Sequence, residues 1–159
     1  ELGAATLMKD FVVSKKQLEF ASKAGASAVL LIVPAFERGL CEIPLSQMIK
    51  EAHDMGLEVL LEVYRAEDLG TALNSDAELV GINSRDLDSL DVSLERAKAI
   101  AAAVPEHDRW RIVAESGIKS REDVEPFIMM GVNKFLVGTA LMTSNDPALA
   151  IRRIKGEEM

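Results

Sequence analysis

Apolar residues in this 159-residue chain gather in short runs that alternate with amphipathic segments from one end to the other. The runs of strand length are Ala5–Met8, Ala28–Val33, Glu58–Val63, Glu78–Ile82, Arg111–Ala114 and Lys134–Val137. Most of these runs are too continuous for strands with one face in water. The pattern therefore predicts parallel strands that are covered on both faces.

Residues that start and stop helices fill the intervals between the runs. The predicted helices are Ser14 to Ala24 before Gly25, Pro44 to Met55 before Gly56, Ser93 to Ala103 before Pro105, Ser120 to Gly131 with Asp123 completing a capping box, and Ala148 to Ile154 behind Asp146-Pro147. Pro126 removes a hydrogen bond inside its helix and is expected to bend it. A β-α unit repeated six times predicts a parallel sheet with right-handed crossovers.

No linker or shift in composition interrupts this pattern, so we expect a single domain over residues 1–159. Two architectures fit the repeat: an open doubly wound sheet, or part of a (β/α) barrel. Both place their ligands at the carboxyl ends of the strands, so candidate functional residues are sought there.

Polar residues stand at most of the predicted strand ends. They are Lys9, Glu62, Asn83 with Arg85, Glu115 with Ser116 and Gly117, and Gly138 with Thr139. A polar residue after a strand is ordinarily the chain emerging into water, and Asn83 is also a good turn former. Glu62 and Glu115 are different, because each ends an apolar run and burial of an unpartnered carboxylate is costly. With Lys9 they could form an acid–base set in a common mouth.

The turns Ser116-Gly117 and Gly138-Thr139 have a second interpretation. Glycine lets the backbone approach an anion closely, and hydroxyl groups add donors. In (β/α) barrels the last two loops often bind phosphate. These two turns therefore predict a phosphate site.

Composition narrows the class of protein. The formal net charge of −8 argues against nucleic acid as a partner, because phosphate backbones need a basic surface. Cys41 is the single cysteine and neither histidine has a metal-ligand pattern around it, so we expect no disulfide and no metal. The longest apolar stretch, residues 28–36, is too short to cross a membrane. A cytoplasmic location fits these features best.

The motifs LMKDFVV, GASAVLLIV, LLEV, GINSRDL, VAESGI and FLVGTALM, in this order, resemble those of the indole-3-glycerol-phosphate synthase family. The resemblance implies a (β/α)₈ barrel and a lyase of tryptophan biosynthesis. That family converts 1-(2-carboxyphenylamino)-1-deoxyribulose 5-phosphate to indole-3-glycerol phosphate, with loss of CO₂ and water and without a metal or organic cofactor.

The resemblance also assigns roles to individual residues. Lys9 matches the general acid, Glu62 the carboxylate that moves a proton during dehydration, and Glu115 the carboxylate that binds substrate and orients the lysine. Further matches in the substrate site are Asn83, Arg85 and Ser116 as polar contacts and Phe11 and Leu30 as apolar walls. Ser116, Gly117, Gly138 and Thr139 fall on the phosphate-binding turns, with Thr139 where a serine is common.

The chain also departs from the family, because whole barrels have roughly 250 residues. By its motifs it begins at the family's third strand, so the first two strand units have no counterpart. We expect two open sheet edges and hence self-association or a complementing chain. Two other functions stay open: an inactive barrel fragment that keeps a phosphate site, and another phosphate-sugar barrel enzyme.

Overall fold

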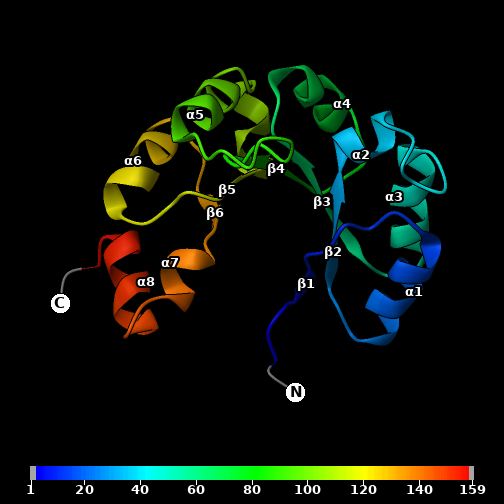
Figure 1. The fold of residues 1–159 in the computed structure, drawn as a ribbon, viewed down its shortest axis with the longest axis horizontal. Helices are drawn as coiled ribbons and strands as arrows, with labels where there is room; N and C mark the ends of the chain where they lie inside the picture. The colour runs from blue at the N-terminus through cyan, green and yellow to red at the C-terminus, as the bar shows by residue number, and fades with distance from the viewer. Residues whose placement is uncertain (1–2, 158–159) are drawn as a thin grey trace. The chain divides into compact units, whose positions relative to one another are not determined.

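The computed structural model of the protein describes residues 3–157, and strands alternate with helices throughout them (Figure 1). The strands are β1 (Leu7–Met8), β2 (Ala28–Ile32), β3 (Glu58–Val63), β4 (Leu79–Asn83), β5 (Ile112–Glu115) and β6 (Lys134–Leu136). They follow one another in the sheet in chain order, and the pairs β1–β2, β2–β3 and β5–β6 are parallel. The predicted β-α repeat is confirmed, with strand ends displaced by one or two residues.

The helices include all those that the sequence predicts and some that it does not. They are α1 (Lys15–Lys23), α2 (Val33–Glu37), α3 (Leu45–Asp54), α4 (Leu69–Leu73), α5 (Leu94–Ala102), α6 (Arg121–Met129), α7 (Thr139–Met142) and α8 (Pro147–Lys155), with 3-10 turns η1 (Ala66–Asp68) and η2 (Glu106–Arg111). The unpredicted α2, α4 and α7 have at most five residues each. An amphipathic period needs about two turns to show, so helices this short leave no signal.

The helix starts confirm the capping signals. The side chain of Gln17 accepts the N–H of Ser14 at 3.1 Å, and that of Asp123 accepts the N–H of Ser120 at 3.0 Å. In α8 the Asp146 carboxylate accepts the N–H of Leu149 at 2.9 Å. Each bond satisfies a backbone donor that the helix itself leaves open.

The chain forms two compact units, each with its own core. Unit 1 holds the described residues up to 63 together with 67–80. Its core combines β2 and β3 with the inner faces of α1 and α3, where Leu18, Leu31, Met48 and Leu61 are fully buried. The buried strands fit the expectation of a parallel sheet covered on both faces.

Unit 2 holds residues 64–66 and the described residues from 81 onward. Ile82, Ile100, Ile112 and Phe127 form its buried centre. Phe127 of α6 also meets Phe135 of β6 edge to face, with ring centroids 6.3 Å apart. The helix-facing side of β6 is therefore the side that carries Phe135. Within residues 3–157, no helix has the length and apolar character needed to cross a bilayer.

Candidate active site

In unit 1, the predicted acid–base residues Lys9 and Glu62 are in direct contact. Lys9 follows β1, and its Nζ donates to Oε2 of Glu62 at 3.1 Å. The Glu62 side chain is 1% exposed, whereas that of Lys9 is 40% exposed. The lysine compensates a carboxylate that burial alone would penalise heavily, while its own ammonium group stays accessible.

Strand register places Leu30 beside this ion pair. Ile32 pairs with Glu62, and Leu30 pairs with Leu60. Alternate residues of a strand share one face, so Leu30 and Glu62 lie on the same face of the sheet. Leu30 is 3% exposed and forms part of the apolar floor next to the carboxylate. Phe11, the other predicted apolar wall, is 59% exposed, so it lies against solvent rather than in the core.

In unit 2, Asn83 ends β4 and starts a tightly bonded loop. Its side-chain Oδ1 accepts the N–H of Arg85 at 2.9 Å, which fixes the orientation of the amide. The guanidinium of Arg85 donates to the carbonyl of Leu90 at 3.1 Å, and Arg85 forms an antiparallel bridge with Val92. Arg85 thus braces the loop, a role that its sequence position does not reveal.

The same loop is closed by an aspartate and a buried tyrosine. Asp86 accepts the N–H groups of Ser89 and Asp88, and these hydrogen bonds lower the pKa of the Asp86 carboxyl. The hydroxyl of Tyr64 donates to Asp88 at 3.2 Å. Residues 84–93 are therefore held at several points, which gives a rigid support to Asn83.

Glu115 ends β5 and is 1% exposed. The N–H of Ser84, the residue after Asn83, donates to the Glu115 carbonyl at 2.8 Å. The predicted residues Asn83 and Glu115 are thereby linked through a single backbone hydrogen bond. Both stand at the carboxyl ends of neighbouring parallel strands, where this class of fold places its ligands.

The turn after β5 has an unusual backbone. Ser116 and Gly117 both have positive φ, 64° and 76°. A Cβ on Gly117 would lie 2.8 Å from Cγ1 of Val92, so glycine is needed both for the backbone angle and for the close approach of the loop before α5. A positive φ is uncommon for a residue other than glycine, so Ser116 marks this turn as a candidate functional feature.

The second predicted phosphate turn follows β6. Gly138 precedes α7, and a Cβ on it would have no heavy atom within 4 Å. Because Glu115 pairs with Leu136 in the parallel ladder, the turns after β5 and β6 emerge at the same edge of the sheet. Within residues 3–157, no three His, Cys, Asp or Glu side chains gather in a way that could hold a metal ion.

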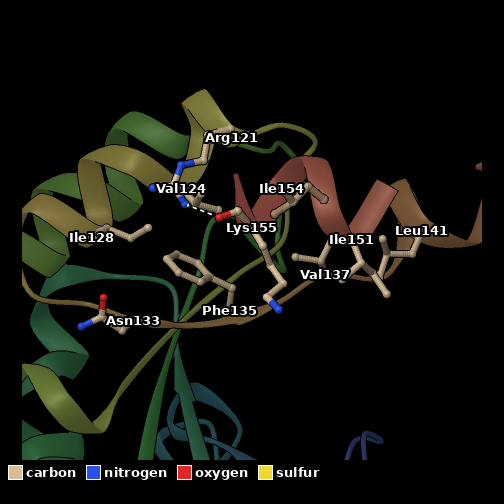
Figure 2. A pocket seen from close by; sticks show the side chains of 10 residues that line it. All are labelled: Arg121, Val124, Ile128, Asn133, Phe135, Val137, Leu141, Ile151, Ile154 and Lys155. Carbon is tan, nitrogen blue, oxygen red and sulfur yellow. Dashed lines mark hydrogen bonds between the residues drawn. The ribbon is translucent and has the colours of Figure 1, made fainter. Parts of the chain in front are cut away.

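An apolar cavity of about 450 Å³ lies elsewhere in unit 2, between α6, β6 and α8 (Figure 2). Phe135 of β6, Val137 directly after that strand, and Ile151 and Ile154 of α8 line it. Arg121 at one end donates to the carbonyl of Lys155 at 3.0 Å. None of the predicted site residues lines this cavity. It lacks paired acid–base groups, so the strand ends remain the candidate site.

Comparison with known proteins connects this geometry to a family. The sequence model described as "Indole-3-glycerol phosphate synthase" matches residues 2–154. The indole-3-glycerol phosphate synthase of Methanothermobacter marburgensis is 40% identical over 147 residues, which are 92% of this chain and 51% of that protein. That of Sulfurisphaera tokodaii is 43% identical over 136 residues, 86% of this chain and 53% of that protein. The chain thus spans about half the length of the curated relatives it matches.

Solved structures support the fold. 3-Hexulose-6-phosphate synthase from Salmonella typhimurium matches with a TM-score of 0.70 at 15% identity, over 96% of this chain and 72% of its own. FabK from Thermotoga maritima matches with a TM-score of 0.63 at 13% identity, over 90% of this chain and 44% of its own. At these identities the likeness concerns the arrangement of strands and helices and not the chemistry.

Proposed function

Because the chain belongs to the indole-3-glycerol phosphate synthase family, we propose that it carries part of the site that makes indole-3-glycerol phosphate. The substrate would be 1-(2-carboxyphenylamino)-1-deoxyribulose 5-phosphate, and the reaction a ring closure with loss of CO₂ and water. The observation that carries the proposal is the contact between Lys9 and the buried Glu62 at 3.1 Å. An accessible ammonium group beside a buried carboxylate is suited to giving and then recovering a proton.

In this proposal Lys9 protonates the substrate's carbonyl oxygen while the aromatic carbon attacks the carbonyl carbon. Glu62 takes part in the proton transfer of the dehydration step, with Lys9 as its hydrogen-bonded partner. Asn83, Arg85 and Glu115 contact the substrate's polar groups, and Phe11 and Leu30 its aromatic ring. Ser116, Gly117, Gly138 and Thr139 hold the phosphate through backbone N–H and hydroxyl donors.

Replacement of the two acid–base residues tests the proposal. We expect Lys9→Met and Glu62→Gln each to lower turnover by roughly 10²- to 10⁴-fold, the contribution typical of a positioned acid or base. Indole-3-glycerol phosphate fluorescence measures the product. The matched controls are Lys15→Met and Glu51→Gln, which break another ion pair of unit 1, 2.7 Å long, on the helices α1 and α3. Turnover in Lys9→Met or Glu62→Gln equal to that of these controls would reject the assignment.

We further propose that the active form contains more than one copy of this chain, or a second chain that supplies further strand units. The short outer strands β1 and β6 support this proposal, because they end the strand order and are half-exposed. Analytical ultracentrifugation tests it, and a monomer that turns over substrate at full rate would contradict it. Biosynthetic chemistry and the single Cys41 support a cytoplasmic location.

A further inference from the structure

The backbone N–H and the backbone carbonyl of Ser84, the residue after Asn83, are both hydrogen-bonded. Its N–H donates to the carbonyl of Glu115 at 2.8 Å. Its carbonyl accepts two donors, the backbone N–H of Ser93 at 2.8 Å and Nη2 of Arg96 at 2.9 Å. Ser84 thereby joins the end of β4 to the end of β5 and to the start of α5.

Arg96 is the side chain that completes this arrangement. It stands in the first turn of α5, where its own N–H donates to the capping hydroxyl of Ser93 at 3.2 Å. Its positive charge also contributes, after the backbone N–H groups of Ser89 and Asp88, to lowering the pKa of Asp86 in the same loop. The guanidinium of Arg96 therefore acts on the start of the loop that follows Asn83, at Ser84 and Asp86, while its backbone N–H is bonded to Ser93 at the end of that loop.

The surroundings of Arg96 are not those of a residue selected for stability alone. Within residues 3–157, Nε of Arg96 and Oγ of Ser84 are buried and make no hydrogen bond. Buried polar atoms left without partners cost free energy that an apolar side chain would avoid. The hydrogen bonds that Arg96 does make, from Nη2 and from its backbone N–H, both go to the loop that follows Asn83.

We propose that Arg96 is a positioning residue that aligns Asn83 and Glu115 through the backbone carbonyl and N–H of Ser84. The inference rests on the function proposed above, because it assumes that Asn83 and Glu115 meet substrate. Arg96 holds the Ser84 carbonyl, and the N–H of the same peptide group, that of Arg85, orients the Asn83 amide. The N–H of Ser84 itself is bonded to the Glu115 carbonyl. Lysine cannot replace Arg96 fully, since an ammonium lacks the planar fork that spans the carbonyl and the loop.

The test compares Arg96→Met and Arg96→Lys with Arg153→Met, a control at an exposed arginine of α8. Two readouts are measured on the same preparations: steady-state kinetics, and amide hydrogen exchange at Ser93, whose N–H shares the Ser84 carbonyl with Arg96. For Arg96→Met we expect kcat to fall roughly 10- to 100-fold with KM within about twofold. Exchange at Ser93 should rise about tenfold, and Arg96→Lys should fall between the wild type and Arg96→Met in both readouts.

The two readouts separate failure of this inference from failure of the proposed function. A wild-type chain without turnover, alone or with added strand units, would reject the function. Exchange at Ser93 would then still decide whether Arg96 holds the peptide, and an unchanged rate would overturn that role. Where the wild type is active, a kcat for Arg96→Met equal to that of Arg153→Met would overturn the inference. A loss of turnover explained by the unfolded fraction, measured by circular dichroism, would overturn it as well.

Discussion

A substitution of Gly117 by alanine separates backbone strain from steric overlap in the turn after β5. The φ angle of Gly117 is 76°, and a Cβ there would lie 2.8 Å from Cγ1 of Val92 and 3.3 Å from Cδ2 of Leu94. Real Cβ atoms do not approach a carbon this closely, so Val92 would have to move. The substitution would therefore shift the turn, the loop before α5 and the predicted phosphate donors.

The magnitude follows from adding the two effects. A left-handed backbone costs an alanine about 1–2 kcal/mol relative to glycine. Moving Val92 away from its preferred rotamer costs about 0.5–1.5 kcal/mol. We therefore expect Gly117→Ala to lower the free energy of unfolding by about 1.5–3.5 kcal/mol. Urea unfolding followed by circular dichroism and by the fluorescence of Trp110, which lies in unit 2, measures this difference.

Two glycines of the same unit serve as controls. Gly131 has a φ of 86° but only ordinary contacts, with Arg109 at 3.7 Å, so Gly131→Ala should show the strain without the overlap, about 1–2 kcal/mol. Gly138 has neither feature, so Gly138→Ala should change stability by less than about 1 kcal/mol. In a Val92→Ala background the cost of Gly117→Ala should fall to that of Gly131→Ala. An equal cost in both backgrounds would refute the role of Val92.

Two further predictions concern the two units separately. In unit 1, burial works to raise the pKa of Glu78, but hydrogen bonds from the backbone N–H groups of Val59 and Glu78 and from His53 lower it overall. A folded pKa below the unfolded value of about 4.5 means that the stabilisation is present above that pH and is lost as the pH falls through the folded pKa. The Tm difference between the wild type and Glu78→Gln should therefore be largest near neutral pH and should shrink as the pH falls below 4.5. A Tm difference that does not change with pH would contradict this. In unit 2, Arg121→Met removes the donor to the Lys155 carbonyl and should raise hydrogen exchange in the last turn of α8 by the equivalent of about 1 kcal/mol, whereas exchange unchanged from the wild type would speak against that cap.

Most helices and strands of this chain can be predicted from its sequence, because the spacing of apolar residues and the residues that begin and end helices indicate the same elements. Continuous apolar runs indicate β2 and β3, and Ser14 and Ser120 mark helix starts whose caps are present. The short helices α2 and α4 are not predicted, because five residues do not complete the two turns that an amphipathic pattern needs. Their formation depends on packing against strands that are distant in sequence.

The candidate site is predictable only in part. A carboxylate after an apolar run identifies Glu62, and its partner Lys9, 53 residues earlier, follows from the shared strand edge. Sequence cannot show that Arg85 turns back onto Leu90, because the choice between ligand and loop carbonyl is made by three-dimensional proximity. The contact of Arg96 with Ser84 is hidden for the same reason, since the two residues are 12 positions apart and lie in different elements. The cavity beneath α8 reflects packing between three elements, which no local pattern encodes.

That cavity has a consequence for how the chain tolerates change. Helix α8 is held at its C-terminal end by Arg121, and its apolar face lies over open space beside Phe135 and Val137 (Figure 2). A larger side chain at Ile151 of α8 can be accommodated in this cavity. Helix α8 carries none of the residues proposed to bind substrate, so Ile151 is a suitable position for a bulky spectroscopic label.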